Sequence, residues 1–226
     1  IGGGSIPHPY RVSLAHHGMV ILDELPEFPR NVLEVLRQPL ESGTVTISRA
    51  HSSIAFPARF MMVAAMNPSH SGKGTIDPRT ARASETAAME KYMSRISGPL
   101  LDRIDIHLEV PAVTYRDLTS KSQGTSSAAM RAQVQRAIAA QRQRFGPHST
   151  TTNAGMNTQQ LKAHTVLDEP SQALMKQAME EMGLSARAFD KVRKVARTIA
   201  DLEGSANIQS NHISEAVQYR LLDRSW

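Results

Sequence analysis

The chain has 226 residues, a length that allows one large domain or two small ones. It contains no cysteine, which excludes a disulfide framework, a zinc site built on thiolates and a thiol nucleophile. No apolar run approaches the roughly 18 residues of a membrane-spanning helix, and the first residues lack the pattern of a secretory signal peptide. We therefore expect a cytoplasmic protein and, because the sequence begins with Ile1 rather than methionine, a fragment or a processed chain.

The formal net charge is +5, from 26 Lys and Arg against 21 Asp and Glu. The first 110 residues carry equal numbers of basic and acidic side chains, so the excess lies in the C-terminal half. A basic half is suited to contact the phosphates of a nucleotide or a nucleic acid. A solvated helical surface would show the same modest excess, so the charge alone does not choose between these interpretations.

In the first half, short apolar runs alternate with helical segments, which predicts a mostly parallel sheet covered by helices. We expect three strands and two helices, over residues 19–22, 60–65 and 104–110 and over residues 30–41 and 84–95. Pro39 predicts an early end or a kink in the first helix. Residues 44–47 and 53–56 predict a β-hairpin whose tip carries Arg49 and His51.

After Pro111 the pattern becomes helical. Residues 1–111 are therefore expected to form an α/β domain, and residues 112–226 an all-helical one that begins with a linker. Five helices are expected, over residues 127–145, 157–164, 169–183, 186–203 and 210–222. Ser185 is expected to cap the fourth of these helices and Gly204 to end it. The basic residues of this helix are expected on the face opposite its apolar stripe, and they are Arg187, Lys191, Lys194 and Arg197.

Two carboxylates, Asp23 and Glu24, directly follow the first predicted strand. Ligands of parallel sheets bind at the carboxyl ends of the strands. One carboxylate there can hold Mg²⁺ through water, and the next can orient an attacking water. The motif is short, and an exposed acidic turn at the end of a strand explains it equally well.

Two further polar residues extend this pattern. Asn67 follows the second predicted strand and is expected at the same edge, and Arg103 precedes the third. A guanidinium at that place can reach the phosphate of a neighbouring subunit. Taken alone, Asn67 is an ordinary residue of a turn, and Arg103 can pair locally with Asp102 or Asp105.

Longer blocks occur in order along the chain: SLAH at 13–16, LDELPEF at 22–28, LRQPLE at 36–41, PARF at 57–60, AAMNP at 64–68, SGPLLDRID at 97–105 and VARTIADL at 195–202. Together they resemble the magnesium-chelatase-like AAA+ ATPases. The ComM/YifB-type branch, whose members include DNA branch-migration motors of natural transformation, is the most similar.

The resemblance implies a partial AAA+ P-loop NTPase core from the Walker B strand onward, followed by a helical lid. It implies ATP and Mg²⁺ as cofactors, with Asp23 holding Mg²⁺ through water and Glu24 activating the attacking water. Asn67 corresponds to sensor 1, Arg103 to the arginine finger supplied to the next subunit, and Arg187 to sensor 2 in the lid.

The resemblance also implies partners. The hairpin that carries Arg49 and His51 corresponds to the pre-sensor-1 hairpin, which points into the pore of a hexameric ring and there grips DNA. A solvent-exposed turn is an equally simple interpretation of this hairpin. DNA, branched or single-stranded, and further copies of the chain are thus the expected partners.

The phosphate-binding loop of the family is missing. No Gly-x-x-x-x-Gly-Lys-Ser/Thr motif occurs, and Gly72-Lys73-Gly74-Thr75 does not fit it because Gly74 follows the lysine. In the family this loop lies upstream of the segment that matches residues 1–20. We therefore expect the chain to be the C-terminal part of a longer protein, with little or no ATP hydrolysis of its own.

Two other functions stay open. A magnesium chelatase motor subunit, which drives metal insertion into a porphyrin, would share Asp23, Glu24, Asn67 and Arg103. A non-enzymatic module that binds DNA or protein would need none of these side chains for chemistry. DNA-stimulated ATP hydrolysis separates the three.

Overall fold

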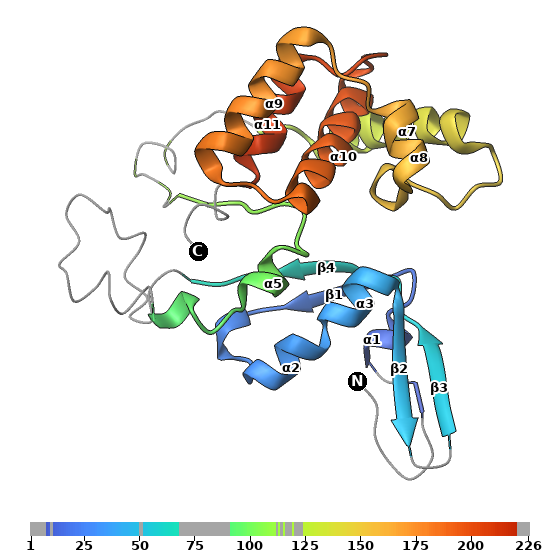
Figure 1. The fold of residues 1–226 in the computed structure, drawn as a ribbon, viewed down its shortest axis with the longest axis vertical. Helices are drawn as coiled ribbons and strands as arrows, with labels where there is room; N and C mark the ends of the chain where they lie inside the picture. Colours follow the sequence, from blue (N-terminus) through green and yellow to red (C-terminus); the bar gives the residue numbers. More distant parts are fainter. Residues whose placement is uncertain are drawn as a thin grey trace. The chain divides into compact units, whose positions relative to one another are not determined.

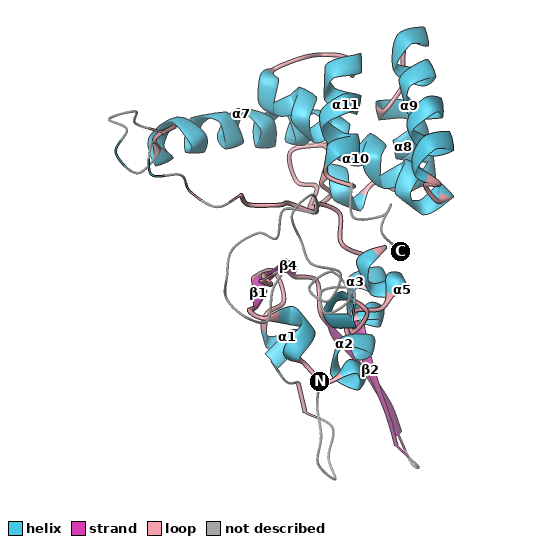
Figure 2. Ribbon diagram, turned by 90° about the vertical axis from the view of Figure 1, so that its left-hand side faces the viewer, coloured by secondary structure: helices cyan, strands magenta, loops and turns pink. Residues whose placement is uncertain are grey.

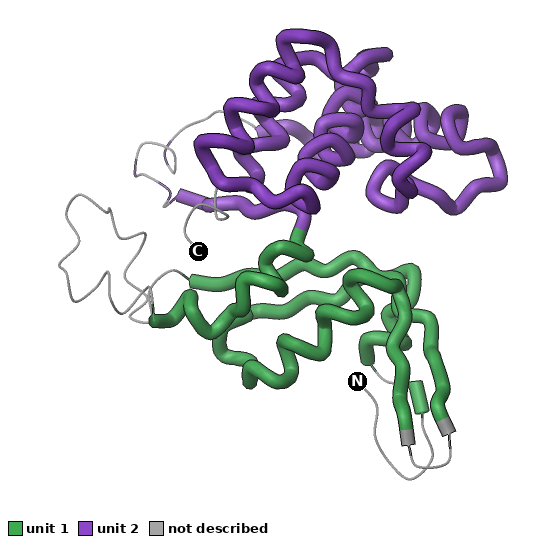
Figure 3. Tube along the Cα trace, in the orientation of Figure 1, with its two compact units in different colours: residues 1–104 green, residues 105–226 purple. Residues whose placement is uncertain are grey.

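A computed structural model describes residues 8–9, 11–49, 52–67, 91–111, 113, 115, 119 and 124–220. The chain divides into two compact units, residues 1–104 and residues 105–226 (Figure 3). The division thus falls a few residues before Pro111, where the sequence pattern changes. The reason is that residues 105–111 contact the second unit: the His107 N–H donates to the Tyr219 carbonyl at 2.8 Å, and Asp105 pairs with Lys191.

The first unit contains a short parallel sheet and a separate hairpin (Figure 1). Strands β1 (Met19–Leu22) and β4 (Met61–Ala64) pair in parallel, with Met19 opposite Met61 and Leu22 opposite Ala64. The hairpin consists of β2 (Thr44–Arg49) and β3 (Ser52–Pro57), with Arg49 opposite Ser52. The mixed α/β fold, two of the predicted strands and the hairpin are therefore confirmed.

Short helices precede, connect and follow these strands: α1 (Arg11–Leu14), the 3₁₀ turn η1 (Leu25–Glu27), α2 (Arg30–Val35), α3 (Arg37–Ser42) and α5 (Gly98–Leu101). The single helix expected over residues 30–41 is divided into α2 and α3 at Leu36. Pro39 explains the break, because it has no N–H to donate to the carbonyl four residues earlier. The helix expected over residues 84–95 lies mostly outside the described residues, and residues 91–93 are helical.

The strand expected over residues 104–110 is wrong. No described residue in this segment belongs to a strand, although its side chains alternate between apolar and polar as predicted. A strand needs a partner along its hydrogen-bonding edge. Here the His107 N–H bonds instead to Tyr219 of the helical unit, and Ile106, Leu108 and Val110 are exposed.

The core of the first unit lies on one face of the sheet. The residues in this core include Leu25, Leu33, Leu36, Val45, Ile96, Leu100 and Leu101, all buried. Figure 2 views β1 and β4 nearly end-on and shows α2, α3 and α5 on the same side of them. The opposite face is apolar but exposed, with Met19 at 51%, Ile21 at 69% and Met61 at 60% of their full accessibility.

The second unit is helical: α7 (Ser127–Phe145), η2 (Asn153–Gly155), α8 (Thr158–His164), α9 (Glu169–Met182), α10 (Ala186–Glu203) and α11 (Ser210–Gln218). All five predicted helices are present. Side-chain caps begin four of them, at Ser126, Asn157, Asp168 and Ser185, and Gly204 ends α10 with φ +76°. No described helix combines the length and apolar character that a bilayer crossing requires.

The basic face expected on α10 is not an open surface. Arg197 is 3% exposed, and Lys194 and Lys191 bond to the Ala154 carbonyl at 3.0 Å and to Asp105 at 2.8 Å. The sequence places these residues opposite the apolar stripe, but neighbouring segments of the unit cover that side of α10 as well. Of the four expected basic side chains only Arg187 lies in an exposed position.

A buried ion-pair network ties α10 to α7 and η2. Asp201 accepts two hydrogen bonds from Arg144, at 2.6 and 2.8 Å, and one from Asn153 at 2.8 Å. Arg197 adds a fourth at 3.2 Å and also donates to the carbonyls of residues 205 and 206. The Asp201 side chain is only 2% exposed, so this network belongs to the interior of the helical unit.

Candidate functional site

The carboxyl ends of β1 and β4 carry the residues that the sequence predicts for phosphate chemistry. Asp23 and Glu24 follow Leu22, the last residue of β1, and Asn67 lies three residues beyond Ala64, the last residue of β4. Because the two strands are parallel and Leu22 stands opposite Ala64, these three residues lie at one edge of the sheet.

Backbone hydrogen bonds continue past the strands and hold this edge together. The Ala65 N–H donates to the Leu22 carbonyl at 2.9 Å, and the Leu25 N–H donates to the Ala65 carbonyl at 3.0 Å. The chain that carries Asp23 and Glu24 is thus fastened at both ends to the segment that leads to Asn67. All three polar side chains are exposed.

Glu24 has an unusual backbone conformation. Its φ of 51° and ψ of 49° lie in the left-handed region, which costs a residue other than glycine of the order of 1 kcal/mol. The Glu24 N–H donates to the Asp23 carboxylate at 3.0 Å, which fixes the orientation of the first acidic side chain relative to the second. Such strain persists only where the surroundings impose it, and it marks this turn as a candidate site.

Residues 91–96 add groups that the sequence did not indicate. Arg95 donates to the Glu27 carboxylate at 3.1 Å and to the Pro26 carbonyl at 3.4 Å, which binds this segment to the turn after Glu24. Burial raises the pKa of the nearby Tyr92 phenol, and the carboxylates of Glu27 and Glu24 raise it further. These contacts join residues almost 70 positions apart, so no local pattern could have predicted them.

Arg103 lies against α3. Its Nη1 donates to the Pro99 carbonyl at 2.6 Å, its Nε donates to Glu41 Oε2 at 3.2 Å, and its Nη2 contacts the same oxygen. The pairing with Asp105 that the sequence allowed is wrong, since that carboxylate pairs with Lys191. These contacts of Arg103 are thus with Glu41 and Pro99, and none of them is with Asp23, Glu24 or Asn67.

The remaining predicted residues lie elsewhere. Arg187 is the second residue of α10, in an exposed position in the helical unit. Arg49 ends β2 at the tip of the hairpin, and only its backbone is described. His51 lies outside the described residues, as does the Gly72-Lys73-Gly74-Thr75 segment.

The described residues of the sheet edge offer carboxylate and amide oxygens to a cation. Among the described residues, no three or more His, Cys, Asp or Glu side chains form a group that could hold a metal ion. Carboxylate oxygens suit Mg²⁺, which keeps several waters and takes further ligands from a bound phosphate. The Asp23 and Glu24 carboxylates are thus of the chemical type that Mg²⁺ prefers.

Comparison with known proteins gives matches to two family models. The family model described as "Magnesium chelatase, subunit ChlI" matches residues 1–118, and the model of the C-terminal part of that subunit matches residues 124–220. The chain belongs to the magnesium chelatase ChlI family. The first match contains Asp23, Glu24, Asn67 and Arg103, and the second contains helices α7 to α11.

Relatives in this family extend the comparison. The chain is 42% identical over 225 residues to the "Competence protein ComM" of Haemophilus influenzae and 40% identical over 226 residues to the "Uncharacterized protein YifB" of Escherichia coli. An uncharacterized protein of Mycobacterium tuberculosis is 32% identical over 221 residues. These matches cover 97–99% of the chain but 43% of each relative, so this ChlI-family chain spans less than half of their length.

Proposed function

We propose that the chain is part of an AAA+ ATPase that binds ATP with Mg²⁺ and hydrolyses it within a ring of identical subunits. The observation that carries this proposal is the in-register parallel pairing of β1 and β4, which places Asp23, Glu24 and Asn67 at one edge. Phosphoryl transfer needs charge neutralisation and positioning rather than a covalent intermediate. Asp23 would supply the first by holding Mg²⁺, and Glu24 and Asn67 would supply the second by positioning the attacking water.

Each residue has a specific part in the proposal. Asp23 holds Mg²⁺ through water, Glu24 orients the attacking water, and Asn67 positions that water against the γ-phosphate. Arg103 belongs to the neighbouring subunit's site, where its guanidinium neutralises charge in the transition state. Arg187, on the proposed lid, binds the nucleotide phosphates.

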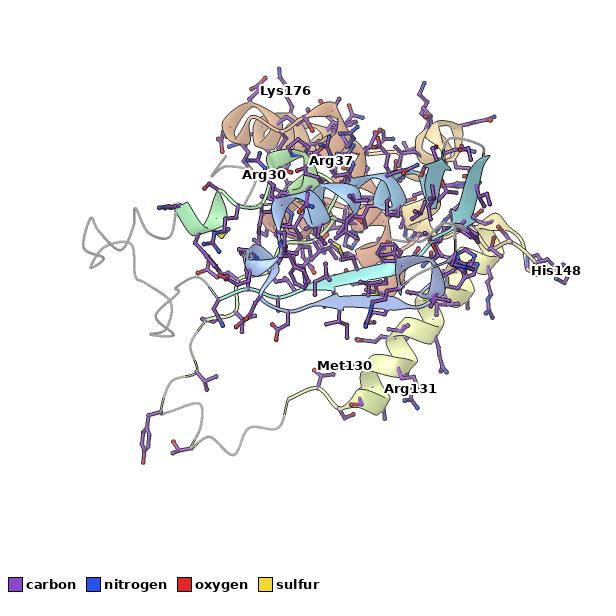
Figure 4. The ribbon with its side chains drawn as sticks, turned by 90° about the horizontal axis from the view of Figure 1, so that it is seen from below. Arg30, Arg37, Met130, Arg131, His148 and Lys176 are labelled. Carbon is purple, nitrogen blue, oxygen red and sulfur yellow. The ribbon has the colours of Figure 1, made fainter. Side chains whose placement is uncertain are left out.

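We further propose that hydrolysis drives branch migration or translocation of DNA. The 42% identity to a protein named for competence supports this. The charge distribution adds support, because α7 contains no acidic residue and its Arg131, Arg136 and Arg142 are exposed. Figure 4 labels Met130 and Arg131 near the start of this helix, and Figures 1 and 2 show α7 extending beyond the other helices of its unit. These arginines offer contacts to a phosphate backbone, and Arg49 and His51 are proposed as further DNA-binding residues.

A second candidate function is that of a magnesium chelatase motor subunit. The description of the matching family model favours it. Both functions use the same sheet edge and differ in what the hydrolysis drives. The response to DNA therefore separates them, and the residues of the site do not.

The decisive experiment measures ATP hydrolysis by the whole protein that contains this chain, with and without branched DNA, beside a Glu24→Gln variant. Because Glu24 orients the attacking water, the variant is expected to lose at least about 100-fold in kcat while its KM for ATP changes little. Glu27→Gln is the matched control, since Glu27 lies on the same turn but pairs with Arg95. Its kcat is expected to stay within about twofold of the wild type, because Glu27 touches no reacting group.

Strong stimulation by DNA that disappears in the Glu24→Gln variant supports the motor function. Robust hydrolysis that ignores DNA supports the chelatase function instead. A whole protein that binds DNA and hydrolyses no ATP contradicts both, and would make this chain part of a binding module.

A further inference from the structure

Arg103, the proposed finger, is already held by its own subunit. Three of its five N–H groups are engaged, two by Glu41 and one by the Pro99 carbonyl. Its side chain is only 10% exposed, whereas that of Glu41 is 53% exposed. A guanidinium with so little exposed surface cannot reach a phosphate of another subunit until it leaves Glu41.

The surroundings of the pair form an open hollow of about 400 Å³ lined by Glu34, Arg37, Gln38, Glu41, Ser42 and Arg103. Two arginines line it, and each is paired with a carboxylate: Arg103 with Glu41, and Arg37, the first residue of α3 (Figure 4), with Glu34 at 2.6 Å. The charges of these two pairs cancel. A phosphate that approaches Arg103 here competes with Glu41 for the same donors.

Glu41 is also coupled to the hairpin. Helix α3 runs directly into β2 through Gly43, whose φ is +69° and where a Cβ would lie 2.7 Å from Arg59 Cγ. Two side-chain hydrogen bonds span this joint: Gln38 Nε2 donates to Thr46 Oγ1 at 3.2 Å, and the Ser42 hydroxyl contacts that of Thr44 at 2.9 Å. The end of α3 and the start of the hairpin are thus fastened to each other, so a displacement of the hairpin moves Glu41.

We propose that Glu41 is a positioning residue that withholds Arg103 from the neighbouring subunit's nucleotide and releases it when the hairpin is displaced. The inference rests on the proposed function, because it needs Arg103 to act on a phosphate and the hairpin to contact DNA. It adds a link between the two. When DNA binds the hairpin, α3 shifts and the ion pair between Glu41 and Arg103 breaks. The Arg103 guanidinium then binds the phosphate of the neighbouring subunit's nucleotide in place of the Glu41 carboxylate.

The test is Glu41→Gln in the whole protein, assayed for ATP hydrolysis with and without DNA. The amide keeps the size of the side chain but removes the charge that competes with phosphate. The rate without DNA is therefore expected to rise roughly threefold to fivefold, the change that loss of one partly exposed ion pair gives. The stimulation by DNA is expected to fall by a similar factor, with KM for ATP unchanged because Glu41 touches no nucleotide.

Glu34→Gln is the matched control, because it makes the same chemical change in the same hollow but breaks the pair with Arg37. It is expected to leave the rate without DNA and the stimulation within about 1.5-fold of the wild type, because Arg37 is not proposed to act on the nucleotide and the pair is a partly exposed i,i+3 pair. Glu41→Asp, which keeps the charge but withdraws it from Arg103, is expected to raise the rate less than Glu41→Gln. It also serves as the second variant if the amide prevents folding, which thermal unfolding detects.

Arg103→Ala separates this inference from the proposed function. If Arg103→Ala leaves hydrolysis intact, the finger assignment is wrong and both fail. If Arg103→Ala abolishes hydrolysis while Glu41→Gln lowers the rate or leaves it unchanged, the inference alone is overturned.

Discussion

The two units of this chain differ in where they place charge and apolar surface. The helical unit buries a charged network around Asp201 and covers the basic side of α10. The first unit leaves its acidic side chains at the sheet edge in solvent and exposes one apolar face of β1 and β4. Burying ions costs free energy unless every partner is in place, whereas an open site must keep its charged groups accessible.

The difference indicates that buried charges and exposed charges have different roles in this chain. The charges of the helical unit are used mainly to hold its own helices together. Those at the sheet edge form few contacts and remain available to a ligand. The comparison predicts that removing a buried charge of the helical unit destabilises the chain strongly, whereas removing an exposed charge, such as those at the sheet edge, hardly changes its stability.

The largest effect is expected at Asp201. Replacing it by asparagine leaves Arg144 and Arg197 without their buried carboxylate, which should lower the free energy of unfolding by about 3–5 kcal/mol. Urea unfolding of the chain, followed by far-UV circular dichroism, measures it. Glu180→Gln removes a carboxylate from an exposed pair with Lys176 in the same unit and should cost less than about 0.5 kcal/mol. Equal losses in the two variants would contradict the distinction between buried and exposed charges.

The same residue predicts a dependence on pH. Burial raises the pKa of the Asp201 carboxyl, but hydrogen bonds from Arg144 and Asn153 and the charge of Arg197 outweigh it, so the pKa lies below its ordinary value. The stabilisation is therefore present above the pKa of the unfolded chain, about 3.9, and is lost as the pH falls through the lower pKa of the folded state.

We expect the urea midpoint of the wild type to fall more steeply than that of Asp201→Asn below about pH 4. Both proteins share every other titrating group, so the difference between the two curves reports Asp201 alone. Parallel curves would show that Asp201 titrates alike in the folded and unfolded chains.

A smaller effect is expected at the start of α10. The Ser185 side chain accepts a hydrogen bond from the Ala188 N–H at 3.1 Å. Ser185→Ala should destabilise the helical unit by about 1 kcal/mol, and Ser185→Asp, which keeps an acceptor, should restore most of the loss. The same unfolding assay compares the three proteins. An alanine variant as stable as the wild type would show that the Ser185 cap does not stabilise the helical unit.

The smallest effect is expected on the exposed face of the sheet. Ile21 is 69% exposed although it lies in the middle of β1. Ile21→Thr keeps a β-branched side chain and should change the stability of the chain by less than about 0.5 kcal/mol. Leu33→Ala, in the core on the other face, should cost about 2–5 kcal/mol. A large loss in the threonine variant would show that this face is covered.

The sequence alone predicted much of the helical unit, because caps and apolar periodicity are local. The signals for α10 all lie in the helix or next to it: Ser185 before it, Gly204 after it, and the apolar stripe that contains Val192 and Ile199. The same periodicity misplaced the basic residues of α10, since it cannot show which segments cover the other side of the helix. Arg197 pairs with a carboxylate one turn away and with carbonyls beyond the end of the helix.

For the candidate site, too, the sequence predicted local features correctly and long-range ones less well. The positions of Asp23, Glu24 and Asn67 after apolar runs follow from the sequence, because each run ends where its polar residues begin. The prediction of a strand over residues 104–110 was wrong. Alternation of apolar and polar residues indicates which side chains share a face, but it does not indicate whether a neighbouring strand is there to pair with.

By itself, then, the sequence determined the α/β composition of the first unit, the helices of the second and the two ends of α10, and it named candidate residues for phosphate chemistry. Only the tertiary structure decided which of these residues meet. In the folded chain β1 pairs with β4 and Glu24 takes a left-handed backbone conformation. Arg103 forms an ion pair with Glu41, which lies 62 positions earlier in the chain. The physical reason is that propensity, capping and periodicity act over a few residues, whereas ion pairs and strand pairing are decided by packing between distant segments.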